Sequence, residues 1–161
     1  MGKLVSWVVL GLFLVIVPFG SWYYLQKGLD YRKNALRELE IKDSLSIRVG
    51  TFRLFQNKTS LVVLDVSDDI YKIKEALLEQ YKSSIGFQIL YPIAQSDVVL
   101  LPEDLLKYFK SKYPDDTFVL VDESRMIRNT YKSDEASVKK LVEHIAIVLP
   151  RPKESDIKMK H

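Results

Sequence analysis

One uncharged stretch limits most strongly what this chain can fold into. Residues Leu4 to Leu25, LVSWVVLGLFLVIVPFGSWYYL, include 22 residues without an acidic or basic side chain. At ~1.5 Å rise per residue, a helix of this length is about 33 Å long and can cross the hydrocarbon core of a bilayer. Trp22–Tyr24 lie at its far end, where amphipathic rings favour a bilayer interface. The stretch predicts a single transmembrane helix.

A cleaved signal peptide is the alternative interpretation of this stretch. The apolar run is longer than the usual core of a signal peptide, and bulky residues follow it where a cleavage site needs small ones. Pro18 and Gly20 are compatible with a kinked membrane helix, because neighbouring backbone or water can satisfy the freed groups. A retained anchor is therefore the favoured interpretation.

The charges beside the stretch bear on its orientation. Lys3 precedes it, whereas five basic residues follow it closely, namely Lys27, Arg32, Lys33, Arg37 and Lys42. The positive-inside rule alone therefore places the following domain in the cytoplasm.

Length and composition exclude several classes of function. Without the first ~25 residues, roughly 135 remain, which suits one domain with a hydrophobic core. The chain has 24 Lys and Arg against 21 Asp and Glu, and this net charge of +3 is too mild to indicate nucleic-acid binding. Since the chain has no cysteine, it can form no disulfide, thiolate nucleophile or cysteine metal site. The absence of cysteine does not determine the compartment in which the protein resides.

The sequence divides into an anchor at 1–27, a juxtamembrane stalk at 28–43, a domain at 44–150 and a polar tail at 151–161. In the stalk, Asp30 to Lys42 is rich in helix formers. Ser44 to Phe55 alternates between apolar and polar residues, which predicts one bent strand or two short ones.

The next four segments alternate between strand and helix patterns. The predicted strands are the short apolar runs Leu61–Val66 and Phe87–Tyr91. One helix is expected from Asp68 and another from Pro102, each with apolar residues at helical spacing. The order of these four segments is strand, helix, strand, helix.

A hairpin and a last helix follow. Thr117–Val121 and Met126–Tyr131 are expected to form antiparallel strands joined by a polar turn at Asp122–Arg125. The final helix begins near Ser133 or Asp134 as its cap and presents a wide apolar stripe. The predicted fold class is α/β, with the order βαβαββα behind one N-terminal transmembrane helix.

This order is that of the thioredoxin core, and the closing section resembles the SCO/SenC proteins. Leu120-Val121-Asp122, Ile127 and Tyr131 match the "LVD..G.I...Y" frame of that family. Its members are membrane-anchored thioredoxin-fold proteins linked to copper delivery and cytochrome oxidase assembly. The resemblance implies a thioredoxin-like domain that its helix holds on the periplasmic side of the cytoplasmic membrane. This placement conflicts with the one that the positive-inside rule gives.

The chain departs from this family where its ligands would lie. The cysteine motif of the family falls on a segment without thiols, at Ser67, Asp68, Asp69, Ile70 and Tyr71. The position of its histidine ligand is taken by Asp115 and Asp116. Cu(I) needs soft donors, and this chain offers only His144, His161 and three methionines. We therefore predict degenerate site positions and no resident metal or cofactor.

Other candidates for chemistry have simpler interpretations. Asp68-Asp69 could bind a hard cation or act as acid and base, but capping of the following helix is favoured. Asp115-Asp116 is better explained as a polar turn. His144, beside Ile145 on the last helix, is expected to lie on the flank or surface. With no catalytic triad order or phosphate-binding loop, the sequence indicates no catalytic residue and no small-molecule substrate.

A run of four apolar residues stands where a loop is expected. Val98, Val99, Leu100 and Leu101 lie between the second predicted strand and the second predicted helix. They either enter the core or form an exposed docking patch.

These observations favour a non-catalytic, single-pass protein of the inner membrane. It would act as a binding or assembly factor of an envelope complex, and the resemblance points to a respiratory oxidase. One alternative is a copper or redox factor that uses ligands supplied by a partner. Another is a small integral subunit of a membrane complex, held by its helix.

Overall fold

The computed structural model describes residues 2–45, 52–55, 57–81 and 83–149. Of these, the side chains of residues 2–6, 8, 9, 52 and 53 are not described. The chain forms two compact units, Met1–Glu38 and Leu39–His161. The predicted polar tail at 151–161 lies outside the described residues.

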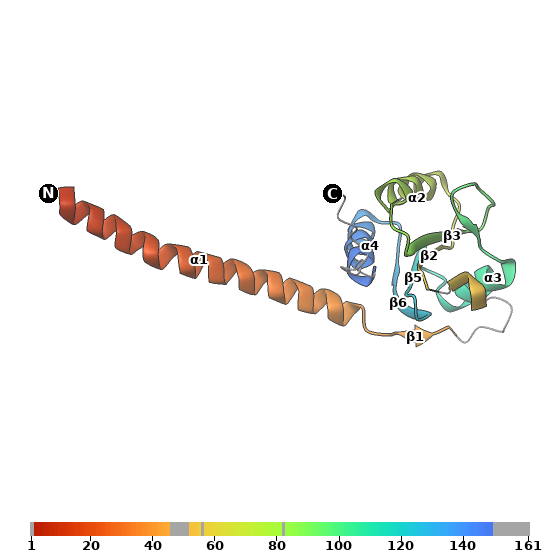
Figure 1. Ribbon diagram of the computed structural model, residues 1–161. Helices are drawn as coiled ribbons and strands as arrows, with labels where there is room; N and C mark the ends of the chain where they lie inside the picture. The colour runs from red at the N-terminus through yellow and green to blue at the C-terminus, as the bar shows by residue number, and fades with distance from the viewer. Residues whose placement is uncertain (1, 46–51, 56, 82, 150–161) are drawn as a thin grey trace, which may run out of the picture. The chain divides into compact units, whose positions relative to one another are not determined.

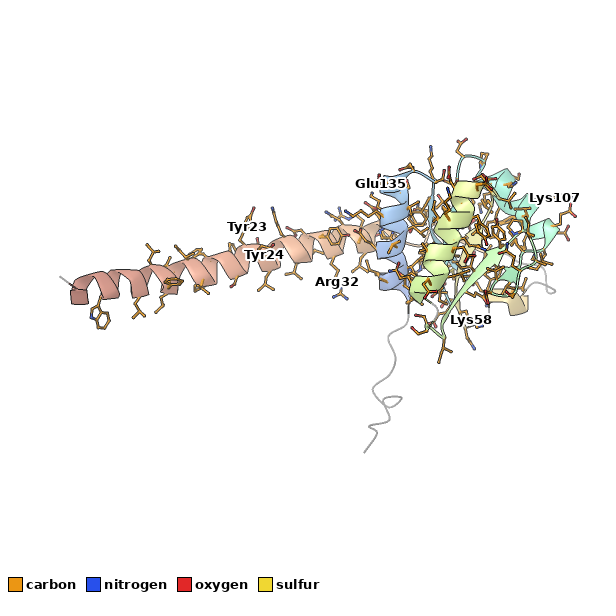
Figure 2. The ribbon with its side chains drawn as sticks, turned by 90° about the horizontal axis from the view of Figure 1, so that it is seen from above. Tyr23, Tyr24, Arg32, Lys58, Lys107 and Glu135 are labelled. Carbon is orange, nitrogen blue, oxygen red and sulfur yellow. The ribbon has the colours of Figure 1, made fainter. Side chains whose placement is uncertain are left out.

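The first unit is the single helix α1, Gly2–Glu38. It contains Pro18 and continues through Gly28, so the predicted anchor and most of the predicted stalk belong to one uninterrupted helix. Tyr23 and Tyr24 project from its surface (Figure 2), and the Lys27 ammonium lies 5.2 Å from the centre of the Tyr23 ring. Among the residues described with their side chains, no helix combines the length and the apolar character needed to cross a membrane.

The second unit is built on a six-stranded mixed sheet with the strand order β1-β6-β5-β2-β3-β4. The strands are β1 Asp43–Ser44, β2 Thr59–Val63, β3 Phe87–Tyr91, β4 Val99–Leu100, β5 Phe118–Val121 and β6 Met126–Tyr131. β2 is central and runs parallel to β3 and antiparallel to β5. The helices are α2 Asp68–Tyr81, α3 Glu103–Lys112 and α4 Glu135–Val148, with a 3₁₀ turn η1 at Phe52–Phe55.

The two faces of the sheet are covered by different helices (Figure 1). Side chains of β2 alternate between the faces, so that Leu61 and Val63 point to one side and Val62 to the other. On the first face they pack with α2 and α4, and we call this the α2/α4 face. On the second face they pack with α3 and η1, and we call this the α3 face. All five residues of β2 are buried, and Leu61–Val63 among them belong to the predicted apolar run.

Most of the predicted elements are confirmed. Strands β3 and β6 have the predicted bounds, and β5 with β6 forms the predicted antiparallel hairpin. The order β2-α2-β3-α3 followed by β5-β6-α4 is the predicted βαβα and ββα order, with β4 added. The α/β class is thereby confirmed.

Helix α4 begins where its sequence signal places it. The side chain of the N-cap Asp134 accepts hydrogen bonds from the Ser137 amide at 3.0 Å and from the Ser137 hydroxyl at 2.8 Å. These bonds hold the pKa of the Asp134 carboxyl below its usual value. Helix α3 begins one residue after Pro102, which occupies its N-cap position.

Three predictions about local structure are wrong. Phe52–Phe55 forms the 3₁₀ turn η1 and no strand, while residues 46–51 lie outside the described part. Strand β2 begins at Thr59 and ends at Val63, so Leu64–Val66 form a loop. The segment after β3 is no plain loop, because Val99–Leu100 adds a parallel edge strand to β3.

Candidate functional site

The predicted site positions lie near the carboxyl ends of the parallel strands β2 and β3. β2 and β3 end at the same edge, and the antiparallel β5 begins there. The Leu64 amide donates a hydrogen bond of 2.9 Å to the Thr117 carbonyl, which joins the loop after β2 to the segment before β5. Ser67–Tyr71 and Asp115–Asp116 therefore lie at one edge. We call residues 64–71, 92–95 and 113–117 the sheet end.

The aspartates of the sheet end have local structural roles. Asp68 and Asp69 occupy the first turn of α2, where a negative charge favours the helix dipole. Asp69 also lies 3.5 Å from the Lys72 ammonium in an exposed ion pair. The described residues contain no group of three acids or histidines that could hold a metal ion. This geometry fits the helix-start interpretation of the pair.

Exposed apolar side chains belong to the same segments of the sheet end. Val66 in the loop after β2 is 47% exposed, Tyr71 in the first turns of α2 is 45% exposed, and Ile93 after β3 is 51% exposed. Asp65, Asp68, Asp69 and Asp115 are exposed on the same edge. An apolar surface with a charged rim is the common composition of a protein-binding site.

A buried lysine lies beneath this surface, and sequence reasoning missed it. Lys74 of α2 is 1% exposed, and its ammonium lies over the rings of Tyr71 and Tyr91, at 4.4 and 5.0 Å from their centres. It donates to the Gln95 side-chain oxygen and lies 2.8 Å from a carboxylate oxygen of Glu75. Lys74 thus links α2 to β3 and to the loop that follows β3.

The helical spacing carried the signal for this lysine. Lys74 is four residues after Ile70 and three before Leu77, and both of these side chains are buried in the α2/α4 core. Its position is therefore inward, although its charge indicates an exposed residue. The aromatic faces and the polar partners replace the hydration that the Lys74 ammonium loses on burial.

His144 is buried, so its predicted place on the flank or surface is wrong. It is 2% exposed, and the Tyr131 hydroxyl lies 2.7 Å from its Nδ1 atom. The two rings meet edge to face, with centres 5.7 Å apart. His144 is three residues after the buried Leu141, which brings it to the inner side of α4, and the hydroxyl of β6 compensates its burial.

The predicted docking patch at Val98–Leu101 is divided by the fold. Leu101 is 3% exposed and belongs to the α3 core. Val98 and Val99 are half-buried and pack on opposite faces of the sheet. Leu100 is 53% exposed. Much of this run therefore enters the core, and its use as a docking patch stays a prediction.

A cleft of about 470 Å³ lies between α2 and the edge formed by β3 and β4. It opens beside β4, at Val98 and Val99. Its lining residues are Lys58, Glu75, Leu78, Glu79, Tyr81, Ser84, Phe87, Gln88, Ile89, Ser96, Asp97, Val98 and Val99. No sequence motif marks this cleft, because it depends on the parallel pairing of β4 with β3.

Comparisons with known proteins yield no relative. No model of a protein family, no curated protein and no solved structure matches the chain.

Proposed function

We propose that the chain is a non-catalytic, membrane-anchored binding protein with a thioredoxin-like, SCO-like domain. The order β2-α2-β3-α3 followed by β5-β6-α4 supports this kind of domain. The chain has no cysteine, so the positions at which the SCO/SenC family carries its thiols cannot perform disulfide exchange. The domain then acts through its surface.

The observation that carries this proposal is the exposed apolar surface of the sheet end. Val66, Tyr71 and Ile93 come from two loops and a helix, and each is about half exposed. Val66 and Tyr71 lie in or next to the segment to which the resemblance assigns the family's cysteine motif. Desolvation of these side chains by a partner would favour association, since buried apolar area contributes roughly 25 cal/mol per Å² before the costs of binding.

The proposed anchor is the uncharged stretch Leu4–Leu25 within α1. Its support is the 22-residue run without charge and the aromatic residues at its end. The resemblance to membrane-anchored proteins favours the inner membrane, with the domain in the periplasm. Other proteins of the envelope are then the partners, and a respiratory oxidase is the complex that the resemblance suggests.

Affinity purification of the full chain in a mild nonionic detergent tests the binding function. We expect a V66S/I93S variant to lose the co-purified partner. The matched control is I41S/I85S, which replaces two exposed isoleucines outside the sheet end. Equal recovery of the partner with both variants would contradict a role for the sheet end. Loss with the control alone would assign binding to another surface.

Titration with Cu(I) tests the non-catalytic part of the proposal. The full chain is expected to bind no stoichiometric Cu(I) at micromolar concentration, because it lacks a thiolate ligand. Tight binding of one Cu(I) per chain would instead favour a copper factor.

A further inference from the structure

The cleft between α2 and the β3-β4 edge has an apolar floor and an acidic rim. Leu78 of α2 and Phe87 and Ile89 of β3 line it, and all three pack against the α2/α4 core. The ring of Tyr81 packs against Phe87 with centres 5.1 Å apart, and its hydroxyl donates to the Val142 carbonyl at 3.0 Å. These contacts fix the floor, so the cleft is a formed feature of the domain.

Three carboxylates and one ammonium line the cleft. Glu75 and Glu79 are one helical turn apart on α2, and Asp97 lies in the segment before β4. Glu75 is paired with the buried Lys74 ammonium at 2.8 Å. Within the described residues, which leave out Lys82, no ion pair engages Glu79 or Asp97. Lys58 contributes the opposing charge, and its side chain projects outward from the domain (Figure 2).

This combination matches one kind of side chain. Lysine and arginine bury an apolar stem while their charged head reaches a polar rim. A stem over Leu78 and Phe87 would leave the head beside the carboxylates of Glu79 and Asp97. The edge strand β4 lies next to the cleft and is last in the strand order. An extended segment can lie along such an edge and direct alternate side chains into a neighbouring hollow.

We propose that the cleft binds an extended segment of a partner protein and takes one of its lysine or arginine side chains. The proposal rests on the proposed binding function for the existence of a partner, and it assigns a second surface with a defined chemical preference. The sheet end contributes apolar contact, whereas the cleft selects positive charge.

Fluorescence anisotropy with a synthetic probe tests this proposal. The probe is a labelled, capped six-residue peptide that alternates valine and lysine, titrated with the full chain in nonionic detergent. We expect saturable binding, and we expect an E79Q/D97N variant to weaken it at least tenfold. The matched control D104N/E123Q removes two exposed carboxylates that do not line the cleft and is expected to leave the affinity within twofold.

The outcomes separate this site from general charge attraction. Equal weakening by both double variants would overturn the proposal, as would equal binding of a peptide with glutamate in place of lysine. Absence of saturable binding to the unaltered chain would also overturn it. The V66S/I93S variant is expected to retain the peptide. The peptide result therefore stands apart from the partner co-purification that tests the proposed function.

Discussion

The two faces of the sheet are packed in different ways. The buried cluster of the α3 face consists of aliphatic and phenylalanine side chains, including Phe55, Leu105 and Phe109. Beside it lies the neutral pair of Ser60 and Gln88, in which the Gln88 side-chain nitrogen donates to the buried Ser60 hydroxyl at 2.8 Å. The α2/α4 face also buries Lys74 and the hydrogen-bonded pair of Tyr131 and His144. The cleft opens on this second face, beside α2. The two faces therefore differ in that the α2/α4 face buries an ammonium and a histidine near the proposed binding surfaces, whereas the polar pair of the α3 face is neutral.

The largest expected effect comes from the apolar face. Phe109→Ala removes a fully buried ring from the α3 cluster and should lower the free energy of unfolding by about 3–5 kcal/mol. Urea unfolding of the full chain in detergent measures this loss. The control is Leu106→Ala at a half-buried position, which should lower the free energy of unfolding by a smaller amount. A loss at Phe109 no larger than at Leu106 would contradict an apolar α3 core.

Substitutions of Lys74 sharpen the contrast between the faces. Lys74→Ala leaves a cavity and should cost roughly 2–4 kcal/mol, by comparison with truncation of other long buried side chains. Lys74→Met keeps the volume and removes the ammonium from the Gln95 side-chain oxygen and the Glu75 carboxylate, neither of which belongs to a fully buried residue, so it should change stability by less than about 1.5 kcal/mol. Unfolding midpoints measure both changes. A loss with Met as large as with Ala would mean that the charge itself holds the loop after β3.

A smaller effect is expected for the buried tyrosine and histidine. Tyr131→Phe removes the hydroxyl that lies 2.7 Å from His144 Nδ1 and should lower stability by about 1–3 kcal/mol, because a buried ring nitrogen loses its partner. The double variant Y131F/H144L should recover part of this loss, since it removes both polar groups. Additive losses in the double variant would contradict a coupled pair.

The smallest predicted effect is a dependence on alkaline pH. Burial raises the pKa of Tyr81, and burial also raises the pKa of Tyr113, beside Tyr108 and Asp116. A raised pKa favours the neutral phenol in the fold, so this stability is present below the ordinary tyrosine pKa of ~10 and is lost as pH rises through the folded value. Between pH 8 and 11, the unfolding temperature of Tyr81→Phe should fall less steeply than that of the unaltered chain. The remaining pH dependence is expected to come from Tyr113. An unchanged slope would contradict a contribution from Tyr81.

The sequence predicts the elements that have a strong local signal. β3 and β6 have clear apolar patterns and α4 has an aspartate cap, and their positions follow from these features alone. β4 has two residues and exists through its pairing with β3, so no local pattern could reveal it. The strand prediction for Phe52–Phe55 was wrong, because alternation over four residues does not exclude a 3₁₀ turn.

The candidate site is only partly readable from the sequence. The meeting of Ser67–Tyr71 with Asp115–Asp116 follows from the antiparallel pairing of β2 with β5, which the predicted order of elements along the chain does not specify. Lys74 and His144 were missed as buried groups, because each depends on a tyrosine from a distant strand to compensate its burial. The cleft was missed because its walls come from separate elements. The two buried groups and the cleft all depend on contacts between segments that are separated in the sequence, which local patterns do not show.

Site-specific photo-crosslinking in cells tests the central claim, binding through the sheet end, most directly. A benzophenone side chain is placed at position 66 or 93 of the full chain, and at the exposed position 104 on α3 as the control. We predict that one envelope protein is joined on irradiation from positions 66 and 93 and is not joined from position 104. No product from the sheet end, or the same product from all three positions, would contradict the claim.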